Sequence, residues 1–150
     1  MDIQASIFHY CNYQDRCHME VRNKLYELGC NTTEVNEHIA RLIEAGVLNE
    51  EKYAQSYARG KFRMKQWGKR KIIQQLKFHQ VSDYCIKKAL KEIDADEYIK
   101  TLHKIAEKKW QGLCITKNKI AAKAGLYRYL VQKGYENDLV QDAINELIKQ

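Results

Sequence analysis

The segment Lys71–Ile93, KIIQQLKFHQVSDYCIKKALKEI, decides the fold. Its apolar side chains recur at intervals of three and four residues in two blocks, Ile72–Leu76 and Ile86–Ile93. This spacing places them on one face of an amphipathic helix. Ser82, which lies between the blocks, is of a type that favours the N-terminal end of a helix. The segment therefore predicts two helices joined by a short turn.

The same pattern occurs twice more in the chain. VRNKLYELG (21–29) leads into EVNEHIARLIEAG (34–46), and LYRYLVQKGY (126–135) leads into LVQDAINELI (139–148). A repeating helical unit is typical of stacked architectures, in which each unit buries its apolar face against the next. The equivalent leucines of the three pairs are 51 and 54 residues apart: Leu25, Leu76 and Leu130.

The composition favours helices as well. The 150 residues include no proline and only seven glycines, and they are rich in lysine, glutamate, glutamine, leucine, isoleucine and alanine. These are residues of helices rather than of sheets and their turns. We predict an all-α protein with nine helices, in three tandem three-helix repeats that form an elongated, curved rod. The predicted repeats are residues 1–48, the basic repeat 49–93, and 94–150.

Capping residues and apolar spacing predict where the helices begin, end and face. Helices are expected to end at Gly29, Gly46 and Gly134. Expected N-caps are Thr32 or Thr33, Asn49, Ser82, Asp94, Thr116 and Asn137. The residues assigned to apolar faces include Ile43, Met64, Ile120 and Val131.

The net charge of +7 is distributed unevenly. Residues 1–51 carry four basic and nine acidic side chains, whereas residues 52–82 carry nine basic and no acidic ones. A second acid-free window, residues 108–133, holds seven basic side chains. Basic surface without nearby acids attracts polyanions, so we interpret both windows as surfaces for nucleic acid or for an acidic protein rather than as ordinary solvated faces.

Candidate contact residues come from these windows. Side chains three or four positions apart share a helix face, so basic stripes lie opposite the apolar ones. We expect contacts with DNA or a protein partner from Arg59, Lys61, Arg63, Lys65, Lys69, Arg70, Lys71, Lys77, Lys117, Lys119, Lys123 and Arg128. Trp67 is a candidate for stacking on a base. The interpretation we favour for Trp67 and Trp110 is nevertheless a core position between helices.

Residues 42–90 resemble the core of the RecX family, regulators of the RecA recombinase. The features that carry the resemblance are a helix ending in Leu-x-x-x-Gly at 42–46, a Gly-x-x-basic-Ile-x-x-x-Leu centre at 68–76, and Ile-x-x-Ala-Leu at 86–90. CNYQDRCHMEVRNKL (11–25) is similar to the N-terminal module of one lineage of that family. Many members have Gly-Pro where this chain has Gly68-Lys69.

The resemblance implies a regulator that binds RecA and its filament on DNA, inhibits the recombinase and its ATPase activity, and thereby modulates homologous recombination, DNA repair and the SOS response. The alternative is a helix-turn-helix transcriptional regulator. Such a protein should show one distinct recognition helix, usually with a dimerising surface. The likeness of the three helix pairs favours the repeat protein.

An enzyme is the third class. The sequence has no Gly-rich phosphate loop, no Gly-x-Ser-x-Gly, and no paired acids of the kind a two-metal site needs. The nearest ligand set is His9, Cys11, Cys17 and His18, but its cysteines are six positions apart, wider than the usual zinc spacing. We expect no catalytic activity, no cofactor and no metal.

Expectations about the environment follow from composition. No apolar run approaches the ~20 residues of a membrane-spanning helix, and MDIQASIFHY lacks the layout of a signal peptide. Five irregularly spaced cysteines predict reduced thiols rather than a disulfide framework. We expect a cytoplasmic monomer that binds no membrane. Its expected partners are the RecA filament and single- or double-stranded DNA, bound with low sequence specificity.

Overall fold

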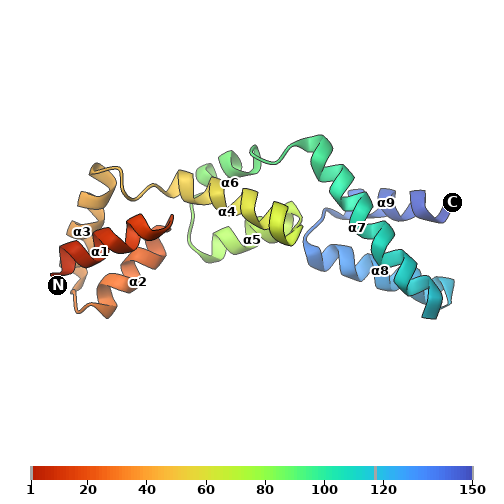
Figure 1. Cartoon of the computed structure of the whole chain (residues 1–150), viewed down its shortest axis with the longest axis horizontal. Helices are drawn as coiled ribbons and strands as arrows, with labels where there is room; N and C mark the ends of the chain where they lie inside the picture. Colours follow the sequence, from red (N-terminus) through yellow and green to blue (C-terminus); the bar gives the residue numbers. More distant parts are fainter. Residues whose placement is uncertain (1, 117, 150) are drawn as a thin grey trace. The chain divides into compact units, whose positions relative to one another are not determined.

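The computed structural model describes residues 2–116 and 118–149, and within them the chain is all-α, as predicted (Figure 1). The described residues form nine helices: α1 (Ile3–Tyr13), α2 (His18–Glu27), α3 (Thr32–Glu44), α4 (Glu50–Lys65), α5 (Lys69–Phe78), α6 (Asp83–Leu90), α7 (Ala95–Thr116), α8 (Lys119–Lys133) and α9 (Asn137–Lys149). No helix in the described part of the chain is long and apolar enough to cross a bilayer.

The chain divides into two compact units, and the division falls inside α4 and α5. Unit 1 comprises Met1–Ala58 and Gln75–Leu90, and unit 2 comprises Arg59–Gln74 and Lys91–Gln150. Each unit therefore takes residues from the middle of the sequence.

Unit 1 is built around α1, α2 and α3, and α2 packs against both of the other two helices (Figure 1). Leu25 of α2 is fully buried, as the repeat pattern predicted. The buried core of these helices consists of Ile7, Cys11, Val21, Leu25, Cys30, Val35, Ile39, Leu42 and Leu48. Six of them belong to the apolar stripes predicted from the sequence, whereas Cys11, Cys30 and Leu48 do not. Each helix therefore buries one face against the others.

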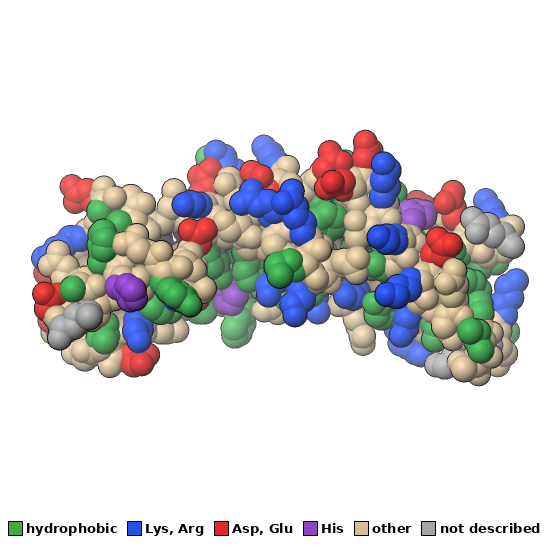
Figure 2. All heavy atoms as spheres, in the orientation of Figure 1, with side chains coloured by type: hydrophobic (Ala, Val, Ile, Leu, Met, Phe, Trp, Pro, Cys, Tyr) green, Lys and Arg blue, Asp and Glu red, His purple; other side chains and the backbone are tan. Residues whose placement is uncertain are grey.

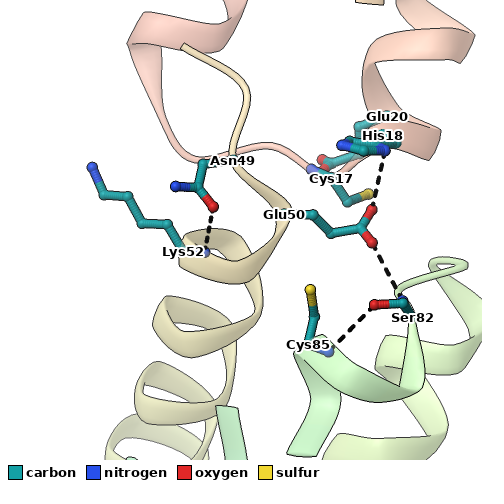
Figure 3. A network of polar contacts seen from close by, with 8 residues as sticks. All are labelled: Cys17, His18, Glu20, Asn49, Glu50, Lys52, Ser82 and Cys85. Carbon is teal, nitrogen blue, oxygen red and sulfur yellow. Dashed lines mark hydrogen bonds and ion pairs between the residues drawn. The ribbon is translucent and has the colours of Figure 1, made fainter. Parts of the chain in front are cut away.

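The starts of α2, α4 and α6 meet at one carboxylate in unit 1, that of Glu50 (Figure 3). Glu50 accepts a hydrogen bond from the Ser82 N–H at 3.3 Å, and its other oxygen lies 3.5 Å from Nδ1 of His18. Helix N-termini carry partial positive charge from unpaired N–H groups. One acidic side chain therefore lies at three helix starts, where it bonds the N–H before α6 and contacts the imidazole of the first residue of α2.

Several predicted helix ends are confirmed. The capping side chain accepts a hydrogen bond from the third backbone N–H of the helix at Asn49 (3.1 Å), Ser82 (3.3 Å) and Asp94 (3.0 Å). The glycines expected to end helices all have left-handed backbone conformations: Gly29 (φ 98°), Gly46 (φ 74°) and Gly134 (φ 103°).

The other predicted N-caps are wrong. Asn31, not Thr32 or Thr33, caps α3, because its side chain accepts the Glu34 N–H at 2.9 Å. Helix α7 continues through Thr116, and Asn118 caps α8 in its place. Asn137 is already the first residue of α9 rather than its cap, and its side chain accepts a hydrogen bond from Tyr127 at 2.6 Å. Asparagine competes well with threonine at these ends because its side chain reaches the helix N–H groups readily.

Four residues assigned to apolar faces are exposed, which corrects the prediction: Ile43 (47% exposed), Met64 (84%), Ile120 (84%) and Val131 (38%). In α4 Tyr53 is buried, and the rest of the buried stripe runs through Ala54, Ala58 and Phe62, at intervals of four residues. Alanine carries little hydrophobic weight, so the spacing of larger side chains indicated a neighbouring face of the helix.

Helices α7, α8 and α9 pack against one another in unit 2 (Figure 1). The rings of Phe62, Tyr98 and Tyr135 follow one another there, with centroids 5.8 Å and 5.1 Å apart. Tyr135 is among the largest fully buried side chains, although its position after a helix gave no sign of this. Leu130 of α8 is fully buried, as the repeat pattern predicted.

All five cysteines are free thiols. Cys11, Cys17, Cys30 and Cys85 are buried, and Cys114 is exposed. Burial raises the pKa of Cys17 to about 11, so this thiol stays protonated at neutral pH. Four of the five therefore act as small apolar residues in the interior.

Candidate functional site

Two loops of unit 2 meet backbone to backbone beside the first basic window. Gly68, between α4 and α5, donates its N–H to the Lys133 carbonyl at 2.7 Å. Arg70 donates its N–H to the Gly134 carbonyl at 2.9 Å. A Cβ atom on Gly68 would lie 2.2 Å from the carbonyl carbon of Gly134, and one on Gly134 would lie 2.4 Å from Cβ of Lys71. Only glycine fits at either position, and we call this contact the glycine junction.

Two buried tyrosines support the glycine junction. The Tyr98 hydroxyl accepts a hydrogen bond from the Lys69 N–H at 2.8 Å and donates one to the Glu136 carboxylate. The Tyr135 hydroxyl donates to the Gln66 carbonyl at 2.9 Å. Burial raises the pKa of both tyrosines, and the negative charge of Glu136 raises it further. Both hydroxyls therefore remain protonated and keep their hydrogen bonds.

Trp67 lies beside the junction with two lysines over its ring. Nζ of Lys71 is 4.5 Å from the ring centroid, and Nζ of Lys61 is 5.1 Å from it. The negative face of an aromatic ring attracts cations, so one indole holds two ammonium groups. Trp67 and Trp110 are both half-buried and neither belongs to the core, which corrects the interpretation we favoured. Stacking of a base on Trp67 stays a prediction.

A second ring, that of Tyr129, holds two further lysines. Its centroid is 4.8 Å from Nζ of Lys109 and 5.9 Å from Nζ of Lys133. The Lys133 ammonium also donates a hydrogen bond to the Lys65 carbonyl at 2.9 Å. Partial burial lowers the pKa of Lys133, and the positive charges of Lys71 and Lys65 lower it further. The fold thus brings like charges close to one another.

These five lysines form what we call the lysine cluster: Lys61 and Lys65 of α4, Lys71 of α5, Lys109 of α7 and Lys133 of α8. Among the described residues, no carboxylate forms an ion pair with Lys65, Lys71, Lys109 or Lys133. Other Lys and Arg side chains are exposed over the α7 and α8 part of unit 2, whereas acidic ones gather at the start of α7 (Figure 2). Unneutralised like charges favour a bound anion such as phosphate or carboxylate.

Only part of the predicted contact set comes together. Lys61, Lys65 and Lys71 join the lysine cluster, and Nζ of Lys69 lies 4.8 Å from the Tyr98 ring centroid. Arg59 pairs with Glu92 of its own unit, with 3.5 Å between Nη1 and Oε2. The remaining described members are exposed: Arg63, Arg70, Lys77, Lys119, Lys123 and Arg128. Lys77 belongs to unit 1, and Lys117 lies outside the described residues.

The sequence did not predict the part of this site that α7 and α8 contribute. Lys109 and Lys133 lie in the second basic window but are not among the predicted contacts, and no pattern in the sequence singles out Tyr129. The glycine after α8 was a signal, but it predicted only the end of a helix. No local pattern pairs Gly68 with Gly134, because their contact depends on how the helices pack.

The candidate metal ligands do not assemble. No group of three or more His, Cys, Asp or Glu side chains in the described part of the chain is placed to hold a metal ion. His18 lies beside Glu50 instead, and Cys11 and Cys17 are buried in unit 1. The reading of His9, Cys11, Cys17 and His18 as a zinc site therefore finds no support in this geometry.

Two successive parts of the chain match models of known protein domains. The model of the second three-helix domain of RecX matches residues 49–90, and that of the third three-helix domain matches residues 96–144. A regulatory protein RecX of Clostridium perfringens is 34% identical over 131 residues, which cover 85% of this chain and 60% of the relative. One of Lactococcus lactis is 28% identical over 143 residues, covering 93% of this chain and 52% of the relative. The chain thus spans little more than half the length of these curated relatives.

Solved structures share the fold. The crystal structure of RecX from Lactobacillus salivarius matches with a TM-score of 0.86 at 24% identity, covering 98% of this chain and 95% of that one. Another crystal structure, of a regulatory protein RecX, matches with a TM-score of 0.82 at 20% identity and covers 92% of this chain and 70% of that one. Together the two domain models match more than half of the sequence, and the chain belongs to the RecX family.

Proposed function

We propose that this chain binds the RecA recombinase and its filament on DNA and inhibits the recombinase, including its ATP hydrolysis. In that role it modulates homologous recombination and DNA repair. The observation that carries the proposal is the match of two successive RecX domains, at residues 49–90 and 96–144. Relatives that match most of this chain are named regulatory proteins.

The lysine cluster supports the proposal physically. Lys61, Lys65 and Lys71 come from the second domain, and Lys109 and Lys133 come from the third. A nucleoprotein filament presents phosphates and acidic protein side chains, which both complement such a surface. Complementary charge speeds association and sets the register of a complex more than it adds affinity. The proposed role needs no catalytic group, because inhibition follows from occupancy of the filament.

Titration into the host RecA on single-stranded DNA tests the proposal. ATP hydrolysis should fall as this chain is added, with half-inhibition at or below an equal concentration of RecA. The same titration with heat-denatured chain controls for added salt and protein. An unchanged rate at several-fold excess over RecA would contradict the proposal.

DNA binding separates this function from the helix-turn-helix alternative. A regulator that contacts phosphates should bind DNA weakly and with little regard to sequence. Each phosphate neutralised on a duplex contributes about −0.9 to the slope of log K against log salt. A tight complex specific for a palindromic site would instead support a transcriptional regulator.

A further inference from the structure

A cavity of about 450 Å³ opens beside the lysine cluster in unit 2. Its volume lies within the roughly 300–1,000 Å³ of small-molecule sites. Ile105 and Leu113 of α7 provide apolar wall, and Tyr129 of α8 provides an aromatic one. Gly112 also lines the cavity, and a Cβ atom there would meet open space. The cavity therefore has a flat aromatic side at Tyr129, an apolar side at Ile105 and Leu113, and free space beside Gly112.

One polar residue on the wall, Gln66, lies in a turn whose backbone is held by hydrogen bonds. Gln66 lines the cavity and has a left-handed conformation, with φ of 57°. This is the left-handed turn that ends α4, in which the Trp67 N–H bonds the Lys61 carbonyl at 3.2 Å. The Tyr135 hydroxyl bonds the Gln66 carbonyl at 2.9 Å and so fixes this backbone. Gln66 thus lines the cavity from a fixed backbone, and its side-chain amide is able both to donate and to accept hydrogen bonds.

Cations lie at the same cavity. Lys108 and Lys109 line it and are exposed, and Lys109 rests 4.8 Å from the Tyr129 ring centroid. Lys133 lies over the same ring at 5.9 Å. A phosphate offers a charge-assisted hydrogen bond, which is stronger than an exposed cation–π contact. An arriving phosphate would therefore draw the Lys109 ammonium away from the Tyr129 ring and free its side of the ring for a base.

We propose that this cavity binds one nucleoside monophosphate group. The base lies against Tyr129 and the apolar wall, the Gln66 amide contacts the edge of the base, and Lys109 with Lys108 binds the phosphate. The group is either a free nucleotide or one unpaired nucleotide of a single strand. This site goes beyond the proposed recombinase inhibition, because it recognises a base as well as charge and requires no recombinase.

NMR titration of the ¹⁵N-labelled chain tests the site directly. The probes are dAMP and a single-stranded deoxyadenosine oligonucleotide. The backbone N–H signal of Gly112 and the side-chain amide of Gln66 should shift and saturate with one of these probes. If dAMP produces the shifts, the source is a free nucleotide; if only the oligonucleotide does, the source is an unpaired nucleotide within a strand. No shift of these signals with either probe refutes the site.

A pair of variants at one position tests occupancy of the cavity. Gly112→Leu directs a side chain into the open space and should abolish the shift of the Gln66 amide. Gly112→Ala also raises helix propensity but adds only a methyl group, so the cavity stays open. This variant should bind the nucleotide probe as tightly as the original chain does. Wild-type affinity in a folded Gly112→Leu variant would place the nucleotide elsewhere and overturn the proposal.

A base-free probe separates stacking from charge. An abasic oligonucleotide of the same length keeps the phosphates and removes the bases. The original chain should bind this abasic strand at least about five-fold more weakly than the normal strand, the lower end of what loss of base stacking causes. The Tyr129→Ala variant should bind the normal strand more weakly by the same factor. Equal affinity for the abasic and normal strands would show binding by charge alone and refute the base site.

Discussion

Alanine at position 68 should disrupt unit 2 although it adds one methyl group. Its Cβ would lie 2.2 Å from the carbonyl carbon of Gly134, 2.3 Å from the backbone nitrogen of Tyr135 and 2.4 Å from the Gly134 oxygen. These are backbone atoms, so no side-chain rotation relieves the overlap. The α8–α9 loop must move away from the start of α5, and the glycine junction opens.

The cost follows from the contacts that are lost. The Gly68–Lys133 and Arg70–Gly134 hydrogen bonds, 2.7 Å and 2.9 Å long, both cross the junction. Each contributes about 0.5–1.5 kcal/mol, and forcing an extra methyl group into a packed site typically costs about 1–3 kcal/mol. We expect a loss of about 3 kcal/mol in the free energy of unfolding. For a chain of this length, that lowers Tm by roughly 6–12 °C.

Tryptophan fluorescence is the appropriate assay. Trp67 and Trp110 both belong to unit 2, so thermal and urea unfolding followed by their emission report on that unit. Gly60→Ala is the matched control, because a Cβ at Gly60 meets open space within α4. It should raise stability by up to about 1 kcal/mol through helix propensity. If Gly68→Ala unfolds at the same temperature and urea concentration as the Gly60→Ala control, the reasoning about the junction is wrong.

Three further predictions concern charge and chemistry. Replacing the three basic residues 69–71 by glutamine should leave Tm nearly unchanged, make the slope of log K against log salt for DNA shallower by up to about three units, and weaken RecA inhibition. The matched control replaces Lys91, Lys100 and Lys104 by glutamine. Equal effects of the two triple variants would exclude a specific contact surface at residues 69–71. Glu50→Gln should destabilise unit 1 by about 1–3 kcal/mol, because a charged acceptor at three helix starts is lost; circular dichroism during urea unfolding measures this, and an unchanged midpoint would contradict it. Iodoacetamide at pH 8 should modify the exposed Cys114 before Cys17, which is buried and whose pKa of about 11 keeps it protonated; peptide mass spectrometry would reveal the opposite order.

The helices were predictable because an amphipathic face is a local pattern. Leu25, Leu76 and Leu130, identified as equivalent from sequence alone, are all fully buried. The buried face of α4 was not predictable in the same way. Tyr53 was predictable and is buried, but the rest of the stripe consists of Ala54, Ala58 and Phe62, and the two alanines add too little hydrophobicity to outweigh Met64 on a neighbouring face.

The basic windows were predictable, but the site they form was not. Sequence shows which helices carry positive charge, whereas Lys65 and Lys133, which meet through a 2.9 Å hydrogen bond, are 68 residues apart. The glycines of the junction offered an ambiguous signal. Gly134 indicated a helix end, which it is, and nothing local indicated that it also lies against Gly68.

The resemblance to the RecX family implies proline in many members at the position after Gly68, where this chain has Lys69. A proline there would fix φ before the helix but could donate no hydrogen bond. Lys69 instead donates its N–H to the Tyr98 hydroxyl at 2.8 Å, and Tyr98 in turn donates to Glu136. The hydrogen bond contributes about 0.5–1.5 kcal/mol, similar to the roughly 0.4–1 kcal/mol that a compatible proline contributes. The start of α5 is thus held by Tyr98 as well as by Gly134, and Lys71 of the lysine cluster projects from a backbone constrained on both sides.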